Sequence, residues 1–143
     1  MPLLNYSTSI SAQKTVGEIQ GILAGHGAKA ILINYDKDGH IESLSFQIMA
    51  GNREIGIRLP VDPDAVLKVM EDQNVPRRLC NRQHAIQVAW RIVKTWIQAQ
   101  MAIIETDMVK LDQVFLPYWI MPSGKTLYAH VVDTQFQLTE GSK

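Results

Sequence analysis

The stretch from residue 74 to residue 104 carries five basic side chains and no acidic one. The formal net charge of the chain is zero, so the +5 of this stretch is balanced by −3 over residues 1–73 and −2 over residues 105–143. Clustered cations create a local positive potential that attracts phosphate groups. The stretch therefore points to nucleic acid as a partner. Its basic residues are Arg77, Arg78, Arg82, Arg91 and Lys94.

Helical geometry selects four of these five cations. At 100° per residue, Arg91 and Lys94 share a polar stripe of the predicted helix, and Arg82 lies off it. The preceding pair, Arg77 and Arg78, can extend this surface, so we expect these four side chains to bind the phosphate backbone. The alternative is that the stripe is only the solvated face of an amphipathic helix, although no acidic residue lies four positions away to pair with its cations.

Two short patterns could support catalysis, and neither fits its chemistry. The run SGKT at residues 123–126 is similar to the end of a phosphate-binding loop, but that motif needs a glycine where this chain has Trp119. Cys80 and His84 are four residues apart, yet no carboxylate lies nearby in the sequence to orient the histidine. We therefore predict no catalytic residue and no enzymatic activity.

Metal and cofactor sites are not predicted either. Glu105, Asp107 and Asp112 could offer oxygen ligands, but they diverge around a helix. The four histidines lack the paired spacing that zinc sites use.

Composition is that of a globular chain. Its 143 residues correspond to about one domain, with 46% apolar and 20% charged residues. No apolar run approaches the ~20 residues that a membrane span needs, and no secretory signal is visible. The single cysteine excludes an internal disulfide and fits a reducing compartment. We expect a soluble, cytoplasmic protein with one domain over residues 1–143.

Periodicity predicts an α+β fold that begins with a helix, a three-stranded antiparallel meander and a second helix over residues 15–73. Thr15 and Glu18 have the spacing of a capping box at the start of the first helix. Alternating apolar residues then mark the strands, whose other face is polar. Asp62 precedes a proline and can cap the second helix, which closes near Gln73.

A long third helix is predicted over residues 81–109. About 28 residues at ~1.5 Å each would span roughly 42 Å, which is longer than a domain of this size needs. Its apolar side chains cover a wide arc that includes Trp90 and Trp96. We expect the helix to pack against a second copy of the chain, giving a homodimer.

An aromatic C-terminal segment follows over residues 110–143. Two prolines interrupt the helical pattern around Tyr118 and Trp119, which stand among other bulky apolar residues. The segment can wrap back over the core, or its aromatic pair can anchor a protein partner.

Two resemblances add to these interpretations. The order of elements over residues 15–73 is similar to that of double-stranded-RNA-binding domains, but the second helix here starts with acidic residues that would repel phosphate. The chain also resembles small uncharacterised proteins encoded in prophages and integrated mobile elements. The segments that carry this second likeness are NYSTSI at residues 5–10, KTVGEI at 14–19, RLP at 58–60 and AWRIVK at 89–94.

Two functions follow as hypotheses. The first is a non-enzymatic mobile-element module that binds the nucleic-acid backbone through Arg77, Arg78, Arg91 and Lys94. The alternative is an inhibitor of a host defence system, of the anti-CRISPR type, that binds a host protein. The resemblance implies a phage or mobile-element origin but supplies no site residues.

Overall fold

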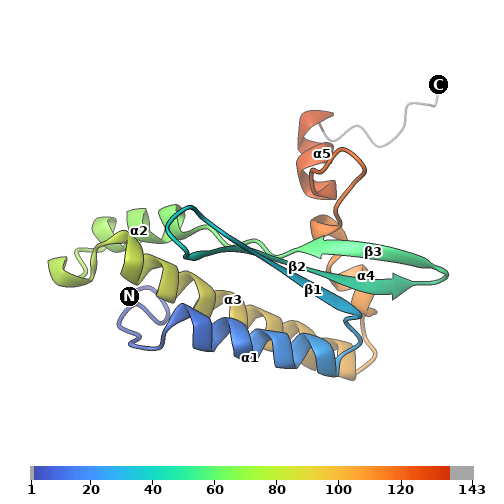
Figure 1. Cartoon of the computed structure of the whole chain (residues 1–143), viewed down its shortest axis with the longest axis horizontal. Coiled ribbons are helices and arrows are strands. Elements are labelled where there is room, and N and C mark those ends of the chain that lie inside the picture. The colour runs from blue at the N-terminus through green and yellow to red at the C-terminus, as the bar shows by residue number, and fades with distance from the viewer. Residues whose placement is uncertain (1, 136–143) are drawn as a thin grey trace.

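Helices cover one face of a three-stranded antiparallel sheet, as the α+β prediction requires (Figure 1). The computed structural model describes residues 2–135. Its first elements are α1 (Ala12–Gly25), β1 (Ala30–Tyr35), β2 (Ile41–Ala50), β3 (Arg53–Arg58) and α2 (Pro63–Asp72). After these come η1 (Arg77–Leu79), α3 (Arg82–Glu105), α4 (Leu111–Val114), η2 (Leu116–Tyr118) and α5 (Leu127–Asp133).

The N-cap of the first helix lies four residues before the predicted one. Ser11 is the N-cap, and its hydroxyl accepts a hydrogen bond from the backbone N–H of Lys14 at 3.1 Å. The predicted capping box at Thr15 and Glu18 is therefore wrong. The Thr15 hydroxyl is buried inside the helix and donates to the Ser11 carbonyl, which leaves Glu18 free to make contacts outside its own helix.

The meander has the strand order β1-β2-β3, with both pairs antiparallel. Its inner face carries Leu44, Phe46, Ile48 and Ile57, all buried beneath the helices. The opposite face carries small and polar residues such as Ser45 and Gln47, the latter exposed. The prediction of one polar face is therefore confirmed.

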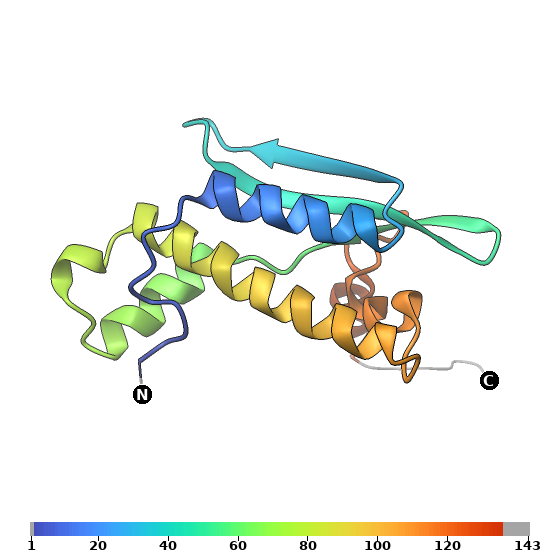
Figure 2. The same ribbon diagram turned by 90° about the horizontal axis from the view of Figure 1, so that it is seen from below.

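α3 is one unbroken helix of 24 residues. The Asn81 side chain caps it by accepting a hydrogen bond from the N–H of His84 at 2.8 Å. α1 and α2 pack against it (Figure 2). Trp90 of α3 is completely buried in the hydrophobic core. The reason for expecting a second copy at this helix therefore fails, because the chain itself covers most of the apolar arc.

α4 and η2 fold back onto this core. Phe115 is completely buried, and its ring meets Phe46 and Trp96 edge-on at centroid distances of 5.5 and 5.7 Å. Trp119 forms an isolated antiparallel bridge with Ile57 of β3 and so borders that strand. Beyond this point α5 stands away from the body (Figure 1). The predicted segment 110–143 continues past the described residues from position 136 onward.

Across residues 2–135, none of the helices combines the length and the apolar character that a membrane crossing demands.

Candidate functional site

The basic stripe of α3 faces α1, not solvent. Arg91 and Lys94 each place a side-chain nitrogen 2.8 Å from the same Glu18 oxygen. Their side chains are only 18% and 16% exposed. The expectation that these two cations lack an acidic partner is wrong, because the partner comes from another helix. The polar stripe serves as an interhelical contact.

The Glu18 carboxylate is stabilised in its charged form by both cations. The hydrogen bond from Lys94 is the largest influence, and Arg91 adds to it, so the pKa of Glu18 lies below its ordinary value despite partial burial. Arg91 also donates to the Thr15 hydroxyl at 3.3 Å. This network holds α1 against α3 and leaves little positive potential for a phosphate.

Arg77 and Arg78 lie elsewhere, in the η1 turn that joins α2 to α3. Both are exposed, and neither forms an ion pair with another residue of the described range 2–135. Arg91 is nine residues into α3, roughly 14 Å along the helix axis from its first residue, Arg82. The four predicted cations are thus divided between an exposed turn and a helix interface, while Arg82 pairs with Asp64.

Tyr118 and Trp119 are docked on the core. The Tyr118 ring meets Trp96 edge-on at 5.4 Å, and both aromatic residues of the pair are half-buried. The Trp119 indole N–H donates to the Asp112 carbonyl at 3.1 Å. The segment wraps back over the body here, which is one of the two alternatives left open by the sequence.

Exposed apolar side chains lie on both sides of this pair in the sequence. We define the C-terminal arm as residues 116–133. Three of its large apolar side chains are exposed, at 40%, 57% and 41% for Leu116, Tyr128 and Val132. The main contact of α5 with another element is with η2, itself part of the arm. Sequence reasoning missed this helix, although Thr126 before it is a good N-cap.

A short turn sets the direction of the arm. Ile120 pairs with Thr126, and Gly124 between them has the positive φ of 90° that favours glycine. The Thr126 hydroxyl accepts the Ala129 N–H and caps α5, while Lys125 pairs with Asp133 at the other end of the helix. The SGKT run is therefore a turn and a helix cap, with its lysine already in an ion pair.

The base of the arm borders a hollow of about 660 Å³. Trp119, Ile120 and Met121 line it from the arm, and Glu54, Ile55 and Gly56 line it from β3. A Cβ added at Gly56 would meet the Ile120 side chain at 3.4 Å, which is ordinary van der Waals contact. Apolar walls beside an exposed apolar helix suit a protein side chain better than a phosphate group.

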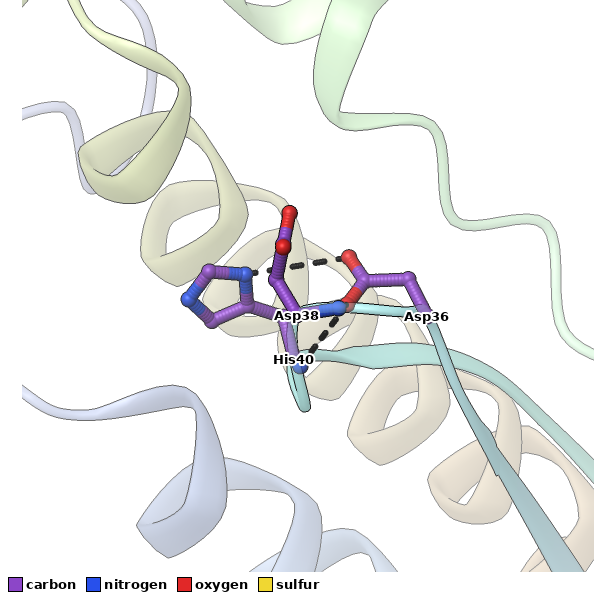
Figure 3. A group of neighbouring side chains, drawn as sticks. All are labelled: Asp36, Asp38 and His40. Carbon is purple, nitrogen blue, oxygen red and sulfur yellow. Dashed lines mark hydrogen bonds and ion pairs between the residues drawn. The ribbon is translucent and has the colours of Figure 1, made fainter.

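One cluster of possible metal ligands lies in the β1–β2 turn. Side-chain atoms of Asp36, Asp38 and His40 are within 4.8 Å of one another (Figure 3). An Asp36 oxygen accepts the backbone N–H groups of Asp38 and His40, both at 2.9 Å. The bond from the His40 N–H is the main reason that the pKa of Asp36 lies below its ordinary value. These contacts are those of a hairpin turn that shapes its own backbone.

Cys80 and His84 each use their polar atoms elsewhere. The Cys80 thiol donates to the Val75 carbonyl at 3.4 Å, and the His84 ring nitrogen Nε2 lies 2.5 Å from the Tyr6 carbonyl oxygen. These separate partners give each side chain a structural role.

Comparison with protein-family models, with curated proteins and with solved structures finds no match.

Proposed function

We propose that this protein is a non-enzymatic binding module whose C-terminal arm docks on another protein. The observation that carries the proposal is the exposure of Tyr128 and Val132 on α5, which stands away from the body. Tyrosine is enriched among the few residues that supply most of the binding energy at protein interfaces, and apolar neighbours help to exclude water around it. A short helix with so little support from its own chain gains its missing contacts from a partner.

The kind of partner rests on the resemblance to prophage and mobile-element proteins. Small proteins from such elements often bind either nucleic acid or a component of a host defence system. The exposed apolar side chains of the arm favour the second, so we propose a host defence protein as the target. The half-buried Tyr118 and Trp119 then act as the base that orients the arm. This role follows from their contacts with Trp96 and Asp112.

Nucleic acid is the weaker candidate. With Arg91 and Lys94 engaged by Glu18, two of the proposed phosphate contacts remain, at Arg77 and Arg78. Two contacts correspond to a logarithmic salt slope of about −1.8, which is too small for useful affinity at physiological salt. Acidic Glu71 and Asp72 at the end of α2 reduce the local potential further.

The test is copurification from the native host, with nuclease treatment before capture. The tagged wild-type chain is compared with Tyr128→Ser/Val132→Ser, and with Leu4→Ser/Met108→Ser as a control that changes two exposed apolar residues outside the arm. We expect one protein to be retained by the wild type and the control and lost from the arm variant. Loss of all bound material on nuclease treatment, or on Arg77→Gln/Arg78→Gln, would overturn the proposal in favour of nucleic acid.

A further inference from the structure

The two edge strands of the sheet differ in whether another segment pairs with their backbone. At β3, Trp119 pairs with Ile57, and the Ile120 N–H donates to the Gly56 carbonyl at 2.7 Å. At β1, no further strand is paired within the part of the chain that the structure describes. Figure 2 shows β1 at the rim of the molecule, with its outer side open. Its outward N–H and C=O groups can therefore accept another strand.

The sequence of β1 does nothing to discourage such pairing. Ala30–Tyr35 reads AILINY and contains no charge and no proline, the devices by which proteins protect an edge strand. Leu32 and Tyr35 are 60% and 57% exposed. A hollow of about 260 Å³ adjoins the strand, lined in part by Leu32, Ser45 and Gln47. The edge thus exposes the apolar side chains of Leu32 and Tyr35 and has no strand partner for its outward backbone groups.

Charge at the two ends of β1 favours a second copy in antiparallel orientation. Lys29 precedes the strand, and the turn that follows, residues 36–38, has a net charge of −1. An antiparallel pair brings Lys29 of each copy to the same end as Asp36 of the other. A parallel pair would instead place the two lysines together, which costs free energy.

The alternation of side chains then fixes the register. Residues that lie opposite each other in an antiparallel pair share a face of the sheet, so the two-fold axis must pass through a single residue position. Centring it on Leu32 sets the two Leu32 side chains side by side on the outer face. Ile31 then lies opposite Ile33 on the inner face, and Ala30 opposite Asn34. Each side chain of β1 keeps the face of the sheet that it has in the single chain.

We infer that two copies of the chain associate through their β1 strands to form a continuous six-stranded sheet with Leu32 at the two-fold axis. This surface is distinct from the C-terminal arm, and the pairing does not depend on what the arm binds. It also replaces α3 as the surface that would make a homodimer.

Sedimentation velocity on the full chain, over a range from about 1 to 500 µM, measures the association. The wild type should shift from a 16.1 kDa monomer toward a particle of twice that mass. Leu32→Lys should remain monomeric, because two lysines would meet at the axis. Met49→Lys is the matched control, since Met49 is an exposed apolar residue on the central strand, away from the β1 edge. It should associate like the wild type.

Cysteine cross-linking tests the register. Leu32→Cys should oxidise to a covalent dimer, whereas Ala30→Cys should not, because the two Ala30 positions would lie roughly 13 Å apart at ~3.4 Å per residue. A wild type that stays monomeric throughout, a dimer indifferent to Leu32→Lys, or equal cross-linking of both cysteine variants would each overturn the inference. Tyr128→Ser/Val132→Ser should leave the dimer intact, which separates this result from the proposed function.

Discussion

The two halves of the C-terminal segment meet the rest of the molecule in opposite ways. Phe115 is completely enclosed by Phe46 and Trp96, while Tyr128, only 13 residues later, is more than half exposed. Phe115 lies between α4 and η2, and Tyr128 lies in α5, so both aromatic residues belong to one continuous segment. The difference shows that composition alone does not separate core from binding surface, and that the turn at residues 120–126 marks the change from one to the other.

Replacing Phe115 and Tyr128 by alanine, one at a time, should give the largest difference in the free energy of unfolding. Phe115→Ala opens a cavity at the centre of the core and should lower the free energy of unfolding by ~3–5 kcal/mol. Tyr128→Ala should lower it by less than ~0.5 kcal/mol, since an exposed side chain loses few contacts. Denaturant unfolding followed by circular dichroism measures both. Equal losses would mean that the arm is part of the packed body.

A second comparison is between two carboxylates. Glu18 forms ion pairs with two cations between α1 and α3, whereas Glu42 is exposed on β2. Glu18→Gln leaves Arg91 and Lys94 partly buried without their acidic partner, so it should lower the melting temperature. Glu42→Gln changes an exposed carboxylate in β2 and is the control, with no shift expected. If the two variants have the same melting temperature, the burial of Arg91 and Lys94 does not require the Glu18 carboxylate.

The effect of Glu18 should also depend on pH in a defined direction. Its pKa is lowered in the folded state, so its contribution is present above the unfolded value and is lost as pH falls through the folded value. The difference in melting temperature between the wild type and Glu18→Gln should therefore disappear in acid. A difference that persisted after Glu18 was protonated would show that shape, and not charge, is responsible.

A smaller contribution to stability, with the opposite dependence on pH, is expected at the C-terminal end of α1. His26 Nε2 lies 3.0 Å from a Glu105 oxygen, and this hydrogen bond is the main reason that the pKa of His26 is raised. Its contribution to stability should be present below the ordinary histidine pKa and lost as pH rises through the folded value. NMR titration of the His26 ring checks this, and Glu105→Gln should bring the pKa back toward its ordinary value.

Local signals in the sequence predicted much of the body. Asp62 does cap α2 by accepting the Ala65 N–H at 3.2 Å, and Asn81 does cap α3. Alternation located the three strands because each side chain faces either the helices or solvent. These features depend on residues within a few positions of one another, and their spacing is visible in the chain.

The contacts that decide the candidate site are distant in the sequence. Glu18 and Lys94 are 76 residues apart, so neighbours on the α3 helix could not reveal that its cations were paired. The same holds for Phe115 and Tyr128, since only the packing of the whole chain shows which one is covered. A cap at Thr126 could have signalled α5, but not its exposure.

The most direct test of the arm is site-specific photo-cross-linking in the native host. A benzophenone-bearing residue replaces Tyr128 in the arm, and the same residue replaces Met108, which is even more exposed but lies outside the arm, as the control. We predict a covalent adduct with one host protein at position 128 that resists nuclease, and none at position 108. The same adducts at both positions, or an adduct that nuclease removes, would contradict the claim that the arm is a protein-binding surface.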